Sequence, residues 1–269
     1  MRDYAVGSIE FLHQFTVLKR MTVALPTLRN PPIVEAVLDI DCDLSPGFDL
    51  AALEANSRTQ FSDQYSKSRT LFQQEIEVVA GTPHASSRRA VQAFQFLHED
   101  EKQLVQVRAN GFSFNRLAPY TSLDDYLPEI ERVWHLYVDL ASPVEIRVIR
   151  LRYINRILVP MMTNTVDLDE FLTVGPRLPE EGRFVLSGFL IQQTANEKET
   201  GHQVNLVLTA QPPENERLPL ILDIAAANRA IGNPRDWSRM RTVVESLRRL
   251  KNRVFFTSLT PKCIALFQT

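Results

Sequence analysis

Apolar and polar side chains alternate at every second residue in several separate stretches of this chain. In the clearest case, 33–41, Val34, Ala36, Leu38 and Ile40 fall on one face and acidic residues on the other. A period of two residues is that of a β-strand with one buried face and one polar face. The chain is therefore predicted to build a sheet from half-buried strands.

Helical stretches interrupt the strands at matching places in the two halves of the chain. The predicted strands are 33–41, 71–80, 91–98, 104–109, 111–117, 145–159, 184–193, 204–210, 218–224 and 254–258. Asp49, Ser122, Asp167 and Asp236 are residues that can cap a helix start. Pro128 leaves open a start later than Ser122 for the second helix. Strand runs between isolated helices are typical of the α+β class.

The order of elements predicts an α+β fold of two similar β-α-β-β-β-α halves with a largely antiparallel sheet, a duplicated arrangement as in TBP-like folds. The halves are residues 28–143 and 144–269, fused into one continuous domain. Residues 1–27 are predicted to be an N-terminal extension or arm. Met21 leaves open that 1–20 derive from an upstream start codon.

The composition excludes several classes of protein. In 269 residues, 30 Lys and Arg stand against 32 Asp and Glu, a net charge of −2, and 44% of the residues are hydrophobic. These values exclude a disordered chain, a collagen-like repeat and a globally basic nucleic-acid coat. No apolar run reaches the length of a membrane helix, and charged residues interrupt the N-terminal stretch, so we expect no membrane partner and no signal peptide.

The two cysteines, Cys42 and Cys263, lie near opposite ends of the chain. The sequence has no CxxC motif, which excludes zinc ribbons and thioredoxin-type sites. Two lone thiols fit a reducing compartment, so a cytoplasmic location is predicted. Cys42 continues an apolar alternation and is interpreted as a core side chain.

Five blocks of residues carry a resemblance to a known family. They are Asn30–Val37, Gly111–Leu117 followed by Pro119 and Tyr120, Leu151–Ile157, Leu218–Ile224 and Phe255–Thr260. On these blocks, which span about residues 28–267, the chain resembles a bacterial family of sporadically distributed, uncharacterised proteins. It departs from that family at Leu123, where members more often carry Trp. The resemblance implies no established reaction.

Asp39, Asp41 and Asp43 form a DxDxD pattern at the end of a predicted strand. Carboxylates on one strand face can bind a hard cation such as Mg²⁺, as in phosphoryl-transfer enzymes. The alternative is a solvated or ion-paired strand face. The sequence has no phosphate-binding glycine loop and no histidine metal motif, so we assign no catalytic residue and predict no cofactor.

Basic residues gather in two places. Arg150, Arg152 and Arg156 share one face of the strand 145–159. They either form an internal ion network with Glu35, Asp39 and Asp41 or capture an anion.

The second basic group lies on the predicted C-terminal helix. It consists of Arg241, Arg248, Arg249 and Lys251, within a stretch from Arg235 to Arg253 that carries a net charge of +5. It is either a solvated face or a docking face for an acidic partner or a nucleic-acid backbone. The net charge of −2 argues against nucleic acid.

The leading hypothesis is a cytoplasmic, non-catalytic binding protein for an anionic small ligand or an acidic protein partner. Its candidate site combines the residues Asn115, Arg116, Tyr120, Arg152, Asn155 and Arg156. One alternative is a metal-dependent phosphoryl-transfer or hydrolase enzyme that uses the three aspartates. A second is nucleic-acid binding through the basic helix. The sequence does not indicate an oligomeric state.

Overall fold

The computed structural model describes residues 26–78, 85–108, 110–162, 165–178, 183, 186–229 and 232–268. Within them lies one open sheet of nine strands in the order β2-β3-β4-β5-β1-β6-β9-β8-β7. Every neighbouring pair of strands is antiparallel. The predicted α+β class with a largely antiparallel sheet is confirmed.

The first seven elements follow the predicted order. They are β1 (Ile33–Asp43), α1 (Leu50–Phe61), β2 (Lys67–Val78), β3 (Ala85–Leu97), β4 (Gln103–Arg108), β5 (Gly111–Leu117) and α2 (Leu123–Ala141). The later elements are β6 (Glu145–Pro160), the 3-10 helix η1 (Leu168–Glu170), β7 (Leu190–Asn196), β8 (Gln203–Ala210), β9 (Arg217–Asn228), α3 (Trp237–Ser258) and α4 (Pro261–Ala265).

The two halves of the chain meet in the middle of the sheet, where β1 pairs with β6. The register places Leu38 opposite Leu151 and Asp39 opposite Arg150. On its other side β1 pairs with β5, and β6 pairs with β9. The two central strands therefore bring the acidic strand of the first half against the arginine-bearing strand of the second.

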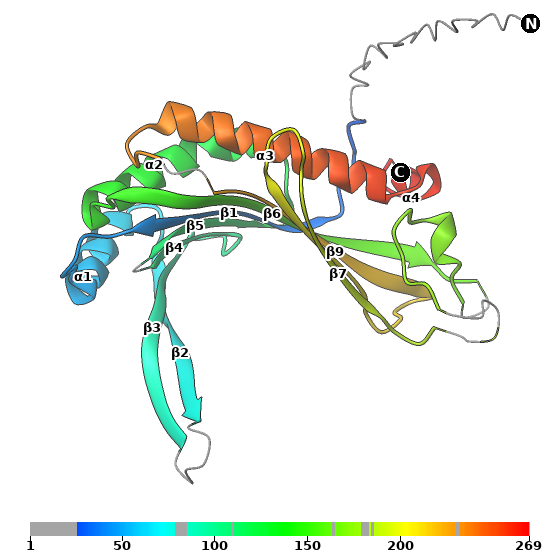
Figure 1. Ribbon diagram of the computed structural model, residues 1–269, viewed down its shortest axis with the longest axis horizontal. Coiled ribbons are helices and arrows are strands. Elements are labelled where there is room, and N and C mark those ends of the chain that lie inside the picture. Colours follow the sequence, from blue (N-terminus) through cyan, green and yellow to red (C-terminus); the bar gives the residue numbers. More distant parts are fainter. Residues whose placement is uncertain are drawn as a thin grey trace, which may run out of the picture.

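Both long helices, α2 and α3, lie on the same side of the sheet (Figure 1). The sheet arches beneath them, and the β2–β3 hairpin descends on one side of the arch while β7 and β9 descend on the other. We call the side under α2 and α3 the helix face, and the opposite side the open face.

The core fills the space between the sheet and the helices. Alternate residues of the central strands, such as Leu38 and Leu151, are buried there beneath Trp134 of α2 and Leu247 of α3. This first hydrophobic cluster draws residues from both halves of the chain. A second cluster packs the C-terminal part of α3 and α4 against β6, β8 and β9.

The predicted helix caps are confirmed. The side chains of Asp49, Ser122, Asp167 and Asp236 each accept a hydrogen bond from a backbone N–H of the following helix. Helix α2 begins directly after Ser122, so Pro128 does not delay its start.

The strands predicted at 254–258 and 184–193 differ most from the structure, and β3 begins at Ala85, before the strand predicted at 91–98. Residues 254–258 belong to α3, so that strand prediction is wrong; the aromatic and β-branched run there continues the buried stripe that Leu247 and Leu250 begin. The strand predicted at 184–193 is found later, as β7 at 190–196, and residues 184 and 185 lie outside the described part.

Of the predicted N-terminal extension, 1–27, only residues 26 and 27 lie within the described residues. Among the helices that the structure describes, none is long and apolar enough to cross a membrane.

Candidate binding site on the open face

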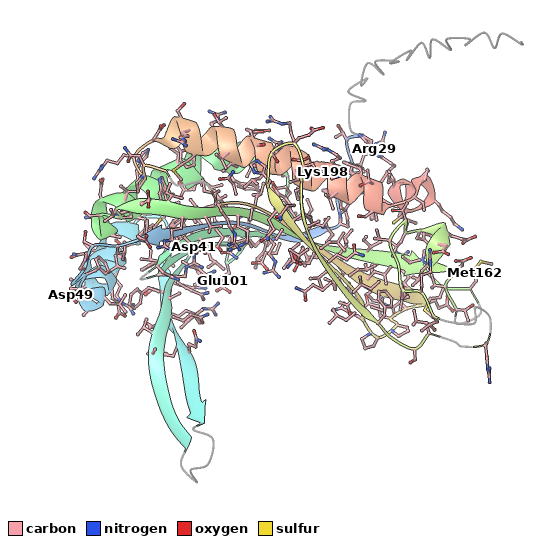
Figure 2. All side chains as sticks on the ribbon, in the orientation of Figure 1. Arg29, Asp41, Asp49, Glu101, Met162 and Lys198 are labelled. Carbon is pink, nitrogen blue, oxygen red and sulfur yellow. The ribbon has the colours of Figure 1, made fainter. Side chains whose placement is uncertain are left out.

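The open face carries a hollow of about 490 Å³ in the middle of the sheet. Because side chains alternate along a strand, the residues next to the buried ones point into this hollow. Six strands supply its polar lining, which consists of Glu35, Asp39, Gln106, Arg108, Ser113, Asn115, Arg150, Arg152, Asn205 and Asp223. Figure 2 shows side chains standing out from both faces of the arched sheet, with Asp41 labelled in its central part.

Asp39 lies at the centre of an ion-pair cluster. Its carboxylate contacts Arg150 of β6 and lies 2.7 Å from Nη2 of Arg108 on β4. The hydroxyl of Ser113 donates a further hydrogen bond of 2.6 Å to Asp39. Nη2 of Arg108 also lies 3.1 Å from Asp41 Oδ1. Two guanidinium groups therefore balance two carboxylates within this cluster.

The third aspartate of the DxDxD pattern is held separately. Nε of Arg147 lies 2.7 Å from a carboxylate oxygen of Asp43. Within the described residues, no three His, Cys, Asp or Glu side chains are grouped so that they could hold a metal ion. Each of the three aspartates instead contacts a guanidinium group, which occupies the carboxylate oxygens that a cation would need.

Arg152 forms a two-pronged ion pair with Asp223 of β9. Nε of Arg152 donates to Oδ1 at 2.9 Å, and Nη2 donates to Oδ2 at 2.6 Å. Arg156 pairs with Glu214 at 2.6 Å. Of the three arginines predicted to pair with Glu35, Asp39 and Asp41, only Arg150 does so. Arg152 does not because it stands opposite Val37 in the β1 register.

Amide side chains form a chain of hydrogen bonds across four strands of the same face. Nε2 of Gln95 donates to Oε1 of Gln106 at 2.9 Å, and Nε2 of Gln106 donates to Oδ1 of Asn115 at 3.1 Å. Nδ2 of Asn115 then donates to Oε1 of Glu35 at 2.6 Å. Each member fixes the next, so these side chains are oriented before any ligand arrives.

The arginines in the hollow keep hydrogen-bond donors that the internal pairs do not use. Among the described residues, neither Nη1 of Arg152 nor Nε of Arg150 donates a hydrogen bond, and the two side chains are 44% and 35% exposed. The hollow thus presents oriented cationic groups with donors available to an acceptor.

The six residues predicted as one site lie in several places. Asn115 and Arg152 line the hollow on the open face. Arg116 and Tyr120 lie near α2 on the helix face, where Arg116 stacks over the ring of Tyr126. The six residues therefore do not converge, because neighbouring strand positions such as 115 and 116 point to opposite faces.

The remaining predicted residues have contacts within the fold. The phenol oxygens of Tyr120 and Tyr153 lie 2.6 Å apart, and burial raises the pKa of Tyr120. Asn155 is almost fully buried, and its Nδ2 donates to the carbonyl oxygen of Leu222 at 2.9 Å. Arg156 lies outside the lining of the hollow.

The four residues of the predicted basic docking face on α3 do not form one exposed surface. Nη1 and Nη2 of Arg248 each lie 2.9 Å from a carboxylate oxygen of Asp124, and this pairing raises the pKa of Arg248. Lys251 points inward and is only 7% exposed. Arg241 and Arg249 remain exposed. Half of the predicted face is therefore engaged within the protein.

Sequence reasoning missed five polar residues of the hollow: Gln106, Arg108, Ser113, Asn205 and Asp223. Strand alternation contained a signal for each of them. Asp223, for example, stands between the buried Leu222 and Ile224. Alternation gives the face of a side chain within its own strand, but it does not say which strands become neighbours.

No protein-family model, curated protein or solved structure matches this chain.

Proposed function

We propose that the protein is a non-catalytic binding module whose open face holds a carboxylate-bearing segment of an acidic protein partner. The observation that carries this proposal is the pair of neighbouring guanidinium groups on β6. Arg150 and Arg152 enter one hollow, carboxylates on adjacent strands orient them, and each retains an unused donor among the described residues.

The chemistry of arginine supports a carboxylate as the recognised group. A guanidinium is planar and offers five N–H donors, which match a carboxylate in a two-pronged geometry. Groups that are already oriented lose little freedom when a partner binds. The volume of the hollow, about 490 Å³, falls within the range of ligand-binding sites.

The other polar residues favour a polypeptide over a nucleic acid. Gln106, Asn115 and Asn205 supply amides that both donate and accept, as peptide groups do. Three carboxylates line the hollow beside three guanidinium groups, so the charges of the lining balance. Binding to a polyphosphate backbone requires a dominant basic surface, which a lining of balanced charge does not provide.

The metal-dependent enzyme is the less supported alternative. It would use Asp39, Asp41 and Asp43, but Arg108, Arg150 and Arg147 already contact these carboxylates. A cation would have to displace guanidinium groups from at least two of them.

The proposal includes an internal duplication of TBP-like form. In each half the first strand lies at the centre of the sheet, and the others follow outward in reverse chain order. A long helix, α2 or α3, follows the last strand of each half. We further propose, on the five sequence blocks described above, that the chain is a bacterial member of that sporadically distributed family.

The location proposed for the protein is the cytoplasm. Its two cysteines, Cys42 and Cys263, are unpaired, which supports a reducing compartment.

A binding titration tests the proposal. The probe is a short fluorescent peptide of alternating Glu and Gln, followed by anisotropy. We expect Arg152→Ala to weaken binding about tenfold or more, because it removes a charge-assisted contact. Arg147→Ala is the matched control: Arg147 is also a β6 arginine with an aspartate partner, but it lies outside the hollow.

Circular dichroism of both variants separates lost binding from lost folding. Unchanged affinity in a folded Arg152→Ala variant would overturn the proposal. So would the absence of peptide binding by the wild-type protein, or tighter binding of single-stranded DNA than of the peptide.

A further inference from the structure

The two edges of the sheet differ in their protection against a further strand. β2, at one edge, carries four charged residues: Lys67, Arg69, Glu75 and Glu77. β7, at the other edge, has the sequence LIQQTAN, with no charge and no proline. Charged residues and proline are the usual devices that keep an edge strand from pairing with another chain. β7 has neither.

The side chains of β7 are also open to solvent. All of its residues except Ile191 are exposed, and Leu190 is 70% exposed. Among the described residues, β7 pairs with β8 alone, so one row of its backbone N–H and C=O groups faces no strand. β8 carries no charged residue either. This whole edge of the sheet is therefore neutral.

An apolar groove of about 380 Å³ runs beside β7 on the helix face. Its lining includes Ala195 of β7, Leu206 of β8, and Leu250 and Val254 of α3. In the first half of the chain, α1 packs against α2 and β3 in the corresponding position. Between β6 and β7, where the second half would carry the counterpart of α1, the described residues contain no helix other than the 3-10 helix η1. A strand added to β7 would carry side chains over this groove.

We propose that β7 pairs antiparallel with β7 of a second copy of this chain, so that two sheets join into one. A two-fold axis places each residue of the segment opposite a residue of the same segment. Any charge near the axis would face a like charge, and β7 has none. With the axis at Gln193, Ile191 stands opposite Ala195, and both lie on the helix face beside the groove.

The pairing has a consequence for the open faces. Residues directly opposite each other in an antiparallel pair project to the same side of the sheet. The open faces of the two copies would therefore look in the same direction. The dimer would present two hollows to one partner surface, which raises the effective affinity for a partner with repeated binding segments.

The oligomeric state of the full chain tests this inference. Light scattering after size exclusion should give twice the chain mass of 30.7 kDa at concentrations from about 1 to 100 μM. Gln193→Lys places two ammonium groups at the axis and should raise the dimer dissociation constant about tenfold or more. Gln73→Lys, the same change on the charged β2 edge, should leave the dimer intact.

Cysteine cross-linking gives a second measurement that does not depend on a disruptive variant. Directly opposite residues of antiparallel strands are close enough for a disulfide. Oxidation should therefore link two chains through Cys placed at one of Gln192, Gln193 or Thr194. The native Cys42 and Cys263 are buried, so the wild-type chain is the control. A monomer at every concentration, a dimer that Gln193→Lys leaves unchanged, or no cross-link at any position would overturn the inference.

Discussion

Lys251 is a buried lysine in the C-terminal half of α3. Its Nζ lies 3.6 Å from the centre of the Tyr153 ring, and no carboxylate among the described residues pairs with it. Burial, and secondarily the charge of Arg248, lowers the pKa of Lys251 to about 7. A basic sequence stretch thus contains one lysine whose ammonium form is costly in the folded chain.

This lysine predicts a pH dependence of stability. The pKa in the unfolded chain is near the ordinary value of 10.5. Between pH 7 and 10.5 the unfolded chain holds a proton that the folded chain releases, so the contribution of Lys251 to stability rises with pH. Lys251 contributes a slope of up to about 1.4 kcal/mol per pH unit to the free energy of unfolding as a function of pH, and this contribution vanishes below pH 7. Urea unfolding at pH 7, 8 and 9 should show a smaller slope for Lys251→Met than for wild type.

The matched control is Lys262→Met. Lys262 is exposed and pairs with Glu170. Replacing it should therefore leave the pH dependence of the free energy of unfolding as it is in wild type. Equal slopes in Lys251→Met and wild type would contradict the assignment to Lys251.

Single residues were predictable from sequence where their partners are near in the chain. Asp49 accepts hydrogen bonds from the N–H groups two and three residues later, and a cap needs no other information. The pair of Arg152 and Asp223 joins residues 71 positions apart. It depends on β6 and β9 becoming neighbours in one register, which neither strand encodes alone.

In helix α3, the end that depends on local contacts was predictable from sequence, and the end that depends on tertiary packing was not. Its start was predictable because Asp236 caps it locally. Its end was not, because Val254 to Ser258 has strand-like composition, whereas packing against β6, β8 and β9 holds it in the helix. Tertiary burial of one stripe outweighed local propensity there.

Truncation of the buried stripe tests the extent of α3. Phe255 belongs to the second hydrophobic cluster and is nearly fully buried. Phe255→Ala should lower the free energy of unfolding by about 3 kcal/mol or more, because it leaves a cavity. Arg249→Ala, an exposed change on the same helix, should shift it by no more than about 0.5 kcal/mol. Similar losses in both variants would contradict the burial of this stripe.

The hydrophobic core joins the two halves of the whole molecule. Leu38 of the first half stands opposite Leu151 of the second, and Nε1 of Trp134 donates to the carbonyl oxygen of Pro234 at 2.9 Å. The order of elements predicted two similar halves, but the shared core follows only from the pairing of β1 with β6.

Dividing the chain should therefore destroy the fold. A fragment of residues 28–143 loses the partner strand of β1 and the α3 side of the first cluster. We expect it to show no cooperative transition in denaturant, while the intact chain unfolds in a single one. Cooperative unfolding of the fragment alone would show that the halves are independent.

The binding role of the open face can be measured directly on arginine side chains. Titration of the ¹⁵N-labelled protein with N-acetylglutamate amide, a probe with one carboxylate and two amides, can be followed through the arginine Nε–Hε signals. The signals of Arg150 and Arg152 should shift and saturate together, because both groups face the hollow and retain donors. Those of Arg147 and Arg235, which lie outside it, should stay in place. Equal shifts across all arginines, or shifts confined to α3, would contradict a carboxylate site on the open face.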